Sequence, residues 1–198
     1  MSTALLVIDA QKIYTTPGSD LHCADAKGTL KRINELIRLF EARSDPLVFV
    51  RHVHKKDGSD LGRLFDFSGE AEEEFNFVEG SQEAEYSEGL VRPAGSSELV
   101  KNRYSAFAGT KLDQQLRKLG VDKVAICGFM TNFCCESTAR SAHDLDYYVD
   151  FIVDATGSPG TENMDEKEIR KVVGELLGAG FAVVSKTAAY LKKRPARR

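Results

Sequence analysis

Two adjacent cysteines, Cys134 and Cys135, are the residues of this sequence best suited to nucleophilic chemistry. They lie in the stretch GFMTNFCCESTARSAHD, residues 128–144, which reads as a turn followed by a helix. A cysteine sulfur can attack a carbonyl carbon and form a covalent acyl intermediate. Because neighbouring positions on a helix do not face each other, at most one of the two sulfurs can serve a given site.

The start of that helix favours Cys134 as the nucleophile. Gly128 lets the backbone bend, and Thr131 or Asn132 can cap the helix that follows. Cys134 would then lie in the first turn, where free N–H groups and the helix dipole lower the pKa of a thiol. The same N–H groups can receive an oxyanion. From these residues alone, a buried structural role for Cys134 stays open.

Cys135 is expected to be structural. It lies about 100° further round the helix than its neighbour. From there its side chain can pack toward the sheet beside Ala139 and Ala142, which are small enough to allow close approach.

A second pair of candidates consists of Asp9 and Lys101. Asp9 follows five apolar residues, and a carboxylate there is costly to bury unless it is paired or neutral. Lys101 ends another strand-like segment and is the natural counter-ion. A helix cap or structural ion pair for Asp9, and a surface position for Lys101, remain the alternatives.

Alternating strands and helices must position these residues. Short apolar runs rich in Val and Ile predict buried parallel strands, and apolar residues at intervals of three and four predict helices. Leu119, Val172 and Leu176 belong to these helical repeats. The order of elements predicts a three-layer, Rossmann-like α/β fold with a mainly parallel sheet of about six strands flanked by helices. The predicted strands are 4–9, 45–54, 123–128, 148–155, 181–185 and a short one ending at Lys101, and the predicted helices are 24–43, 110–119 and 165–178.

The carboxyl ends of these strands are the expected place for a site, because ligands of open parallel sheets bind there. Besides Asp9 and the 128–134 turn, this rule selects His52 and His54 at the end of the second strand and Asp154 at the end of the strand that follows the turn.

Composition narrows the class of protein. The 198 residues carry a net charge of −3 and fit one domain, 1–198. Neither nucleic acid nor a membrane is an expected partner, and the basic stretch 192–198 reads as a solvated tail. The sequence shows no export signal, so we expect a cytoplasmic protein whose four cysteines are reduced.

The segment 55–97 interrupts the alternation. It is acidic, contains several glycines and has no period, so we read it as a long excursion over the strand ends or into a subunit interface. Exposed aromatic side chains in such a loop usually need a partner surface, which predicts a homo-oligomer. The aromatic residues concerned are Phe65, Phe67, Phe75 and Phe77.

Three motifs in this order, ALLVIDAQ, LVKNRYSAF and GFMTNFCCESTARSAHD, resemble those of the isochorismatase-like cysteine hydrolase superfamily. That superfamily includes nicotinamidases, N-carbamoylsarcosine and ureidoacrylate amidohydrolases, biuret hydrolases and isochorismate-cleaving enzymes. The resemblance implies a catalytic triad of Asp9, Lys101 and Cys134. It also implies a cis peptide bond between Phe129 and Met130, which aims the Met130 N–H into an oxyanion hole beside that of Cys134.

The resemblance further implies aromatic or apolar groups around a small-molecule substrate, here Tyr14, Phe107, Phe129 and Phe133, although all four could equally be core residues. Relatives are commonly dimers or tetramers, which supports the expected homo-oligomer. No cofactor is implied.

Departures from the family pattern limit the reactions that this chain is expected to catalyse. Nicotinamidases carry an Asp-x-His pair and further histidines for a metal ion, whereas this chain has His52 and His54 and no third histidine nearby, so we expect no metal site. Isochorismate-cleaving enzymes typically have glycine where Cys134 stands. We therefore expect hydrolysis of a C–N bond in a small amide, carbamoyl or ureido compound through a thioester. The alternatives are a vinyl-ether hydrolase and a non-catalytic binding or assembly member.

Overall fold

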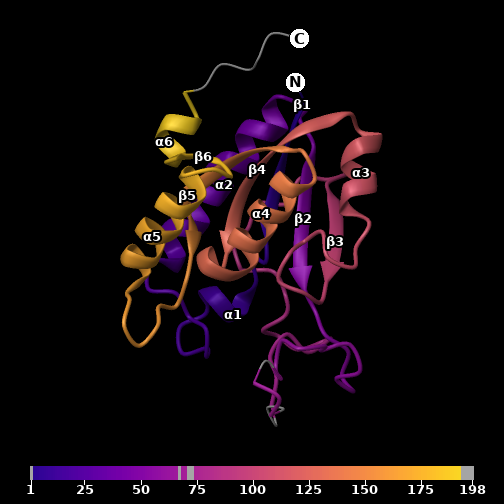
Figure 1. Ribbon diagram of the computed structural model, residues 1–198, viewed down its shortest axis with the longest axis vertical. Coiled ribbons are helices and arrows are strands. Elements are labelled where there is room, and N and C mark those ends of the chain that lie inside the picture. Colours follow the sequence, from indigo (N-terminus) through magenta and orange to yellow (C-terminus); the bar gives the residue numbers. More distant parts are fainter. Residues whose placement is uncertain (1, 67, 71–73, 193–198) are drawn as a thin grey trace.

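A single parallel sheet forms the centre of the computed structural model, which describes residues 2–66, 68–70 and 74–192. Its strand order is β3-β2-β1-β4-β5-β6, and every neighbouring pair is parallel. The predicted α/β architecture is thereby confirmed (Figure 1). The strands are β1 Ser2–Ile8, β2 Leu47–His52, β3 Ser97–Lys101, β4 Val121–Phe129, β5 Tyr148–Gly157 and β6 Val183–Ser185.

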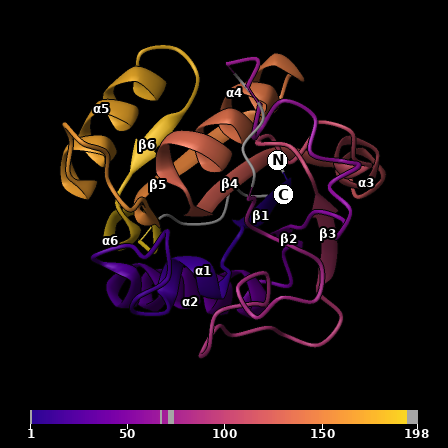
Figure 2. The ribbon, with the colours of Figure 1, turned by 90° about the horizontal axis from the view of Figure 1, so that it is seen from below.

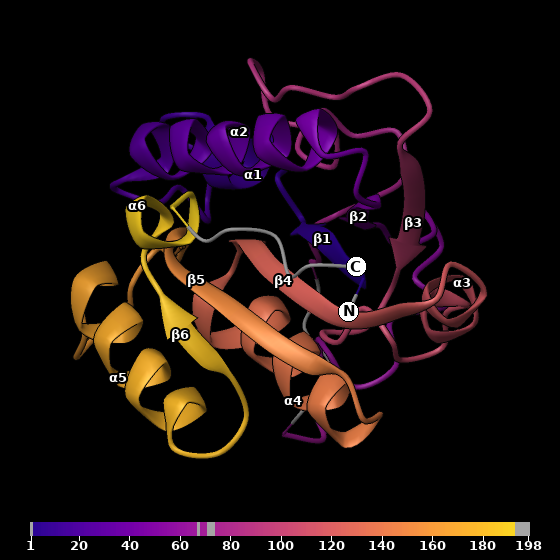
Figure 3. The ribbon, with the colours of Figure 1, turned by 90° about the horizontal axis from the view of Figure 1, so that it is seen from above.

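Helices cover both faces of the sheet. Figure 3 shows α2 on one side and α4 and α5 on the other. Two hydrophobic clusters fill the layers between helices and sheet, and β1 contributes alternate residues to each, as the pleat of a strand requires. The helices are α1 Lys12–Thr15, α2 Ala26–Ala42, α3 Leu112–Lys118, α4 Glu136–Asp144, α5 Glu166–Gly178 and α6 Thr187–Tyr190, and a π-helical turn, η1, spans Thr131–Cys135.

The predicted helices are present, with ends shifted by one or two residues. α5 begins with a capping box in which Asp165 accepts from the Glu168 N–H and Glu168 accepts from the Asp165 N–H. The apolar repeats that predicted these helices include three exposed side chains, since Leu119, Val172 and Leu176 are 53%, 41% and 52% exposed. On these helices, only some of the apolar residues of the repeat are buried against the sheet.

The excursion 55–97 extends beyond the carboxyl ends of β2 and β3 (Figure 1). Apart from β3, which begins at Ser97, its described residues form no helix or strand, only isolated bridges such as His54 with Val78. The expected exposure of its aromatic residues is wrong for Phe77, which is buried. Phe65 and Phe75 are half-buried and contact each other, and Phe67 lies outside the described residues.

No helix in the described part of the chain has both the length and the apolar composition needed to cross a membrane. In the predicted basic tail, Lys192 is exposed and residues 193–198 lie outside the described part.

Candidate active site

The candidate residues meet at the point where the strand order reverses. β1 and β4 are neighbours, with β2 and β3 on one side and β5 and β6 on the other (Figure 2). Such a switch point opens a crevice at the carboxyl ends of the two central strands. Asp9 follows β1 directly, and Cys134 lies in η1, just after β4. The fold therefore places both residues at one crevice.

Gly128 allows β4 to pass close to the end of β1. Its φ is +126°, and a Cβ there would lie 1.9 Å from the carbonyl oxygen of Ile8, so no side chain fits. Asp9, the next residue of that neighbouring segment, has a φ of +45°, a conformation that is uncommon outside glycine. The backbone after β1 and the end of β4 therefore come close together at the crevice.

The peptide bond between Phe129 and Met130 is cis, as the resemblance implied. The turn that follows is held by the backbone, because the Met130 carbonyl accepts from the N–H groups of Phe133 and Cys135 at 3.3 and 3.1 Å. The expected side-chain cap is not what the structure has, since none is formed at η1.

Thr131 and Asn132, which we expected to cap the helix, instead tie the turn to β5 and to the residue that follows it. The Thr131 hydroxyl donates to the hydroxyl of Thr156 at 2.9 Å, and the Asn132 side-chain oxygen accepts from Ser158 Oγ at 3.0 Å. These bonds fix η1, and Cys134 with it, relative to the neighbouring strand.

Lys101 links the other two triad candidates. Its Nζ lies 2.7 Å from Asp9 Oδ2 and 3.2 Å from Cys134 Sγ, and it also donates to the Arg103 carbonyl at 3.0 Å. The side chains of Asp9 and Lys101 are completely buried, and Cys134 is 3% exposed. The structure thus brings a carboxylate, an ammonium and a thiol together, away from bulk water.

Burial governs the protonation of these groups. It raises the pKa of Cys134 to about 12, which the Lys101 ammonium only partly offsets. The net pKa of this thiol is therefore raised, whereas the helix start was expected to lower it. Burial also raises the pKa of Asp9, against the opposing effect of Lys101. For Lys101, burial lowers the pKa but the Asp9 and Cys134 charges outweigh it, so the net pKa is raised.

Cys135 lies where the sequence predicted. It is fully buried in the hydrophobic cluster that also contains Ala139 and Ala142. Burial raises the pKa of this thiol far above its usual range, which makes it a poor nucleophile.

The four predicted substrate-binding residues lie in different surroundings. Tyr14 and Phe129 stack with ring centroids 5.1 Å apart, and both are buried. Phe133 is 38% exposed and pairs with Tyr104 at 5.1 Å. Phe107 packs into the hydrophobic cluster and stacks on Tyr147 at 5.9 Å. Phe133, one residue before Cys134, is therefore the exposed member of the set.

Asp154 does not belong to the site, and its selection from the strand-end rule was wrong. β5 continues to Gly157, so Asp154 lies within the strand and not at its end. Its Oδ1 accepts from the backbone N–H and the hydroxyl of Thr187 at 2.7 and 2.8 Å. These bonds cap the short helix α6.

His52 and His54 lie beside the triad candidates. Their Nε2 atoms are 2.9 Å apart. Burial holds the pKa of both histidines below its usual value, so both rings are neutral near pH 7. A nitrogen of His52, a carboxylate oxygen of Asp9 and Cys134 Sγ all lie within 4.8 Å of one another.

That set of nitrogen, oxygen and sulfur would suit a zinc ion by chemical type. The Lys101 ammonium, however, already contacts two of the three donors, and a second cation there would be repelled. The residues do not fit a resident metal.

Gln11, which positions His52, was not selected from the sequence. Gln11 is fully buried; its Oε1 accepts from the His52 N–H, and its Nε2 donates to the carbonyls of His52 and Ala84, each at 2.9 Å. Its position two residues after Asp9, just past the end of a predicted strand, was the available signal. Phe77 was also missed as a site residue, and its ring stacks on His52 with centroids 4.5 Å apart.

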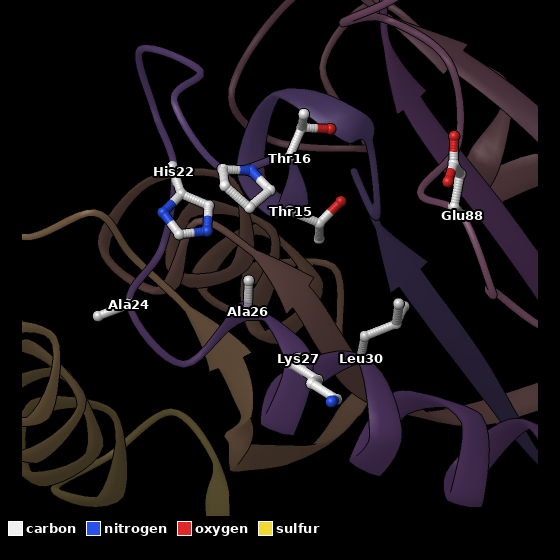
Figure 4. Close-up of a pocket in the computed structure, with 9 residues that line it drawn as sticks. Thr15, Thr16, His22, Ala24, Ala26, Lys27, Leu30 and Glu88 are labelled. Carbon is white, nitrogen blue, oxygen red and sulfur yellow. The ribbon is translucent and has the colours of Figure 1, made fainter.

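A separate cavity of about 430 Å³ lies where α1 and its following loop approach α2 (Figure 4). None of the triad candidates lines it. Its lining residues are Thr15, Thr16, Pro17, His22, Ala24, Ala26, Lys27, Leu30 and Glu88.

Comparison with known proteins gives a consistent picture. The family model described as "Isochorismatase domain" matches residues 3–189. Nicotinamidase 3 of Arabidopsis thaliana is 35% identical over 158 residues, 78% of this chain and 73% of the relative. A probable inactive nicotinamidase of the same plant is 30% identical, over 81% and 83%. The ureidoacrylate amidohydrolase RutB of Azorhizobium caulinodans is 27% identical, over 86% and 82%.

The fold also matches solved structures. A cysteine hydrolase from Pseudomonas syringae pv. phaseolicola superimposes with a TM-score of 0.87 at 26% identity, covering 96% of this chain and 91% of the other. The similarity therefore spans the sheet, both helical layers and the crevice.

Proposed function

The chain belongs to the isochorismatase family of hydrolases, and on that premise we propose that it is a cysteine-dependent amidohydrolase acting on a small amide, carbamoyl or ureido compound. The observation that carries the proposal is the position of the Lys101 ammonium, 2.7 Å from Asp9 Oδ2 and 3.2 Å from Cys134 Sγ. A buried cation in contact with both a carboxylate and a thiol stabilises whichever of them carries the negative charge.

The first half of the reaction transfers the acyl group to sulfur. Asp9 takes the thiol proton as Cys134 Sγ forms a bond to the carbonyl carbon, so the negative charge moves from the carboxylate to the carbonyl oxygen. The backbone N–H groups of Met130 and Cys134 receive this oxyanion. The C–N bond then breaks, the oxyanion electrons re-form the carbonyl, and Asp9 returns the proton to the departing nitrogen.

The second half releases the acid. A water molecule attacks the thioester carbon and gives a proton to Asp9, the C–S bond breaks, and the thiol regains that proton. The raised pKa of Asp9 suits both halves, since it makes the carboxylate a stronger base than an ordinary aspartate. The raised pKa of Cys134 means that the proton leaves sulfur during attack and not before it.

The substrate class is supported by the relatives. Two of them are named for primary-amide or ureido chemistry, a nicotinamidase and a ureidoacrylate amidohydrolase. Each name denotes hydrolysis of a C–N bond next to a carbonyl in a small molecule. Cys134 favours this class over vinyl-ether hydrolysis, which needs no nucleophilic thiol.

A non-catalytic role is the second candidate, because one relative is named as probably inactive. The intact contacts of Asp9, Lys101 and Cys134 argue against it, since a chain that only binds a partner has no need for a buried ammonium between a carboxylate and a thiol. Ion pairs of this kind are costly to bury without a function.

The test is release of ammonia from a panel of nicotinamide, N-carbamoylsarcosine and ureidoacrylate, with Cys134→Ala as the control. Hydrolysis of at least one compound by wild type and none by the variant supports the proposal. An acyl adduct trapped at Cys134 and seen by peptide mass spectrometry would identify the intermediate. Hydrolysis that survives Cys134→Ala would overturn it.

A further inference from the structure

His52 carries a polar atom that the mechanism above does not use. Its Nδ1 is buried and has no hydrogen-bond partner among the described residues, and the whole side chain is 1% exposed. A buried acceptor or donor without a partner is destabilising unless something fills it, so such an atom beside a reaction centre points to a ligand. Whether Nδ1 is a donor or an acceptor depends on which ring nitrogens of His52 and His54 carry a proton.

The ring protons of His52 and His54 can be assigned by starting from Asp60, which faces His54. The Asp60 carboxylate accepts from the Lys55 N–H at 3.0 Å and from Asn102 Nδ2 at 3.2 Å, and its pKa is lowered, so it is an anion. His54 Nδ1 lies 3.4 Å from Asp60 Oδ1, a distance at which the attraction is mainly electrostatic. Because a carboxylate only accepts, the nitrogen facing it carries the proton.

The assignment then passes along the pair. A neutral His54 with its proton on Nδ1 has a lone pair on Nε2, and His52 Nε2, 2.9 Å away, must donate to it. His52 is also neutral, so a proton on its Nε2 leaves Nδ1 unprotonated. The free atom of the His52 ring, Nδ1, is therefore an acceptor.

Three residues hold His52 in place, one through its backbone and two through its ring. Gln11 binds the His52 backbone N–H and carbonyl, each at 2.9 Å. Phe77 stacks on one ring face, with an interplanar angle of 7°. His54 fixes the Nε2 edge. A ring so constrained presents its lone pair in one direction, which is what a specificity-determining acceptor requires.

We propose that His52 Nδ1 accepts a hydrogen bond from an N–H group of the substrate, at or next to the scissile C–N bond. The proposal rests on the proposed amidohydrolase function and adds how the site selects substrates that carry an N–H group. The His52 ring lies beside the reacting groups, because one of its nitrogens is within 4.8 Å of both a carboxylate oxygen of Asp9 and Cys134 Sγ. A substrate group that the ring recognises therefore belongs to the reacting end of the molecule. Primary amides, carbamoyl and ureido compounds offer that N–H, and esters do not.

Kinetics with a matched pair of compounds tests the selectivity. The pair is nicotinamide and methyl nicotinate, which differ by NH₂ against OCH₃ at the carbonyl. The matched variants are His52→Asn and His52→Leu, which have nearly the same shape, and the Asn side-chain oxygen can take the place of Nδ1. His143→Leu is the position control, because His143 is exposed and its ring contacts Phe181.

For nicotinamide, His52→Leu should lower kcat/KM by about 10- to 100-fold, the effect of losing one buried hydrogen bond, and His52→Asn should recover most of that loss. For methyl nicotinate, the two His52 variants should agree within about threefold, because no N–H is present. His143→Leu should leave both rates unchanged. Equal losses for the amide and the ester, or no rescue by Asn, would overturn the proposal.

Nitrogen-15 NMR of histidine-labelled protein tests the assignment without turnover. His52 Nδ1 should have the chemical shift of an unprotonated ring nitrogen, and His54 Nδ1 that of a protonated one. In the Cys134→Ala variant, nicotinamide should shift the His52 Nδ1 resonance and methyl nicotinate should not. A protonated His52 Nδ1, or no response to nicotinamide, would overturn the proposal. The NMR measurements do not depend on turnover. They can therefore be interpreted even if wild type hydrolyses neither compound and the proposed function fails.

Discussion

Lys101 Nζ lies 3.2 Å from Cys134 Sγ, although the two residues are 33 positions apart in the chain. The lysine ends β3 at one edge of the sheet, and the cysteine follows β4, on the far side of β1 and β2. The same ammonium contacts Asp9 at 2.7 Å. A compact cation between a base and a nucleophile makes demands on size and geometry as well as on charge.

Lys101→Arg tests these demands. The guanidinium keeps the positive charge but is larger and planar and has a fixed fork of donors, which does not fit a fully buried space between Asp9 and Cys134. We expect a folded variant whose kcat/KM falls at least about a hundredfold, the scale of losing one well-placed electrostatic stabiliser. Circular dichroism checks the fold and ammonia release checks the rate. Near-normal activity would show that charge alone is needed.

Substitution by alanine should affect amide hydrolysis differently at Cys134 and at Cys135. Cys134→Ala should abolish amide hydrolysis, whereas Cys135→Ala should keep most of it, because Cys135 lies in the hydrophobic cluster beside Ala139. Removing the buried Cys135 sulfur should lower the free energy of unfolding by about 1 kcal/mol. Urea unfolding and ammonia release measure the two effects. A comparable loss of activity in both folded variants would contradict the assignment.

The pH dependence follows from Asp9. The reaction needs the carboxylate form, which exists above its pKa and is lost as pH falls through it. Because burial raises that pKa, the acid limb of kcat/KM should lie above the ordinary aspartate value of about 3.9. The Cys134 pKa of about 12 and the raised pKa of Lys101 predict no loss from these groups up to about pH 9. A pH profile with a non-titrating amide measures both limbs, and an acid limb below pH 4 would argue against Asp9 as the base.

Chelation should leave the activity intact. Asp9, His52 and Cys134 have metal-ligating atoms within 4.8 Å, but the Lys101 ammonium contacts two of these residues. We expect ammonia release to be unchanged after dialysis against EDTA and 1,10-phenanthroline. Atomic emission of the purified protein gives the matching readout, and a stoichiometric metal that restores an inactive apo-protein would show this expectation to be mistaken.

A homo-oligomer remains a prediction. Phe77 no longer supports it, since its ring is buried against His52 within the chain. The neighbouring rings of Tyr104 and Phe133, 37% and 38% exposed, are apolar surface that a second copy would cover. Sedimentation equilibrium at micromolar concentration should give at least twice the mass of one chain. A single-chain mass for wild type would refute the prediction, and a lower association constant for Phe133→Ser would locate the interface.

The sequence alone determined the architecture and the three groups that meet at the crevice. The strands contain short apolar runs, and a polar residue that ends such a run is visible in the sequence, as for Asp9 and Lys101. In a parallel sheet all these ends lie at one edge, so their proximity follows from topology. The separation of Cys134 from Cys135 follows from helical rotation, which is equally local.

Only the tertiary structure decided how these groups are buried and what surrounds them. The raised pKa of Cys134 comes from burial, which the Lys101 ammonium, brought in from a distant strand, only partly offsets. Asp154 was misplaced because β5 runs on to Gly157, and Phe77 because a loop folds back over His52. The free acceptor on His52 depends on Asp60 acting through His54, and the Asp60 carboxylate is held by Asn102, 42 positions further along the chain. Burial and hydrogen-bond direction are set by long-range packing, and for that reason no local pattern encodes them.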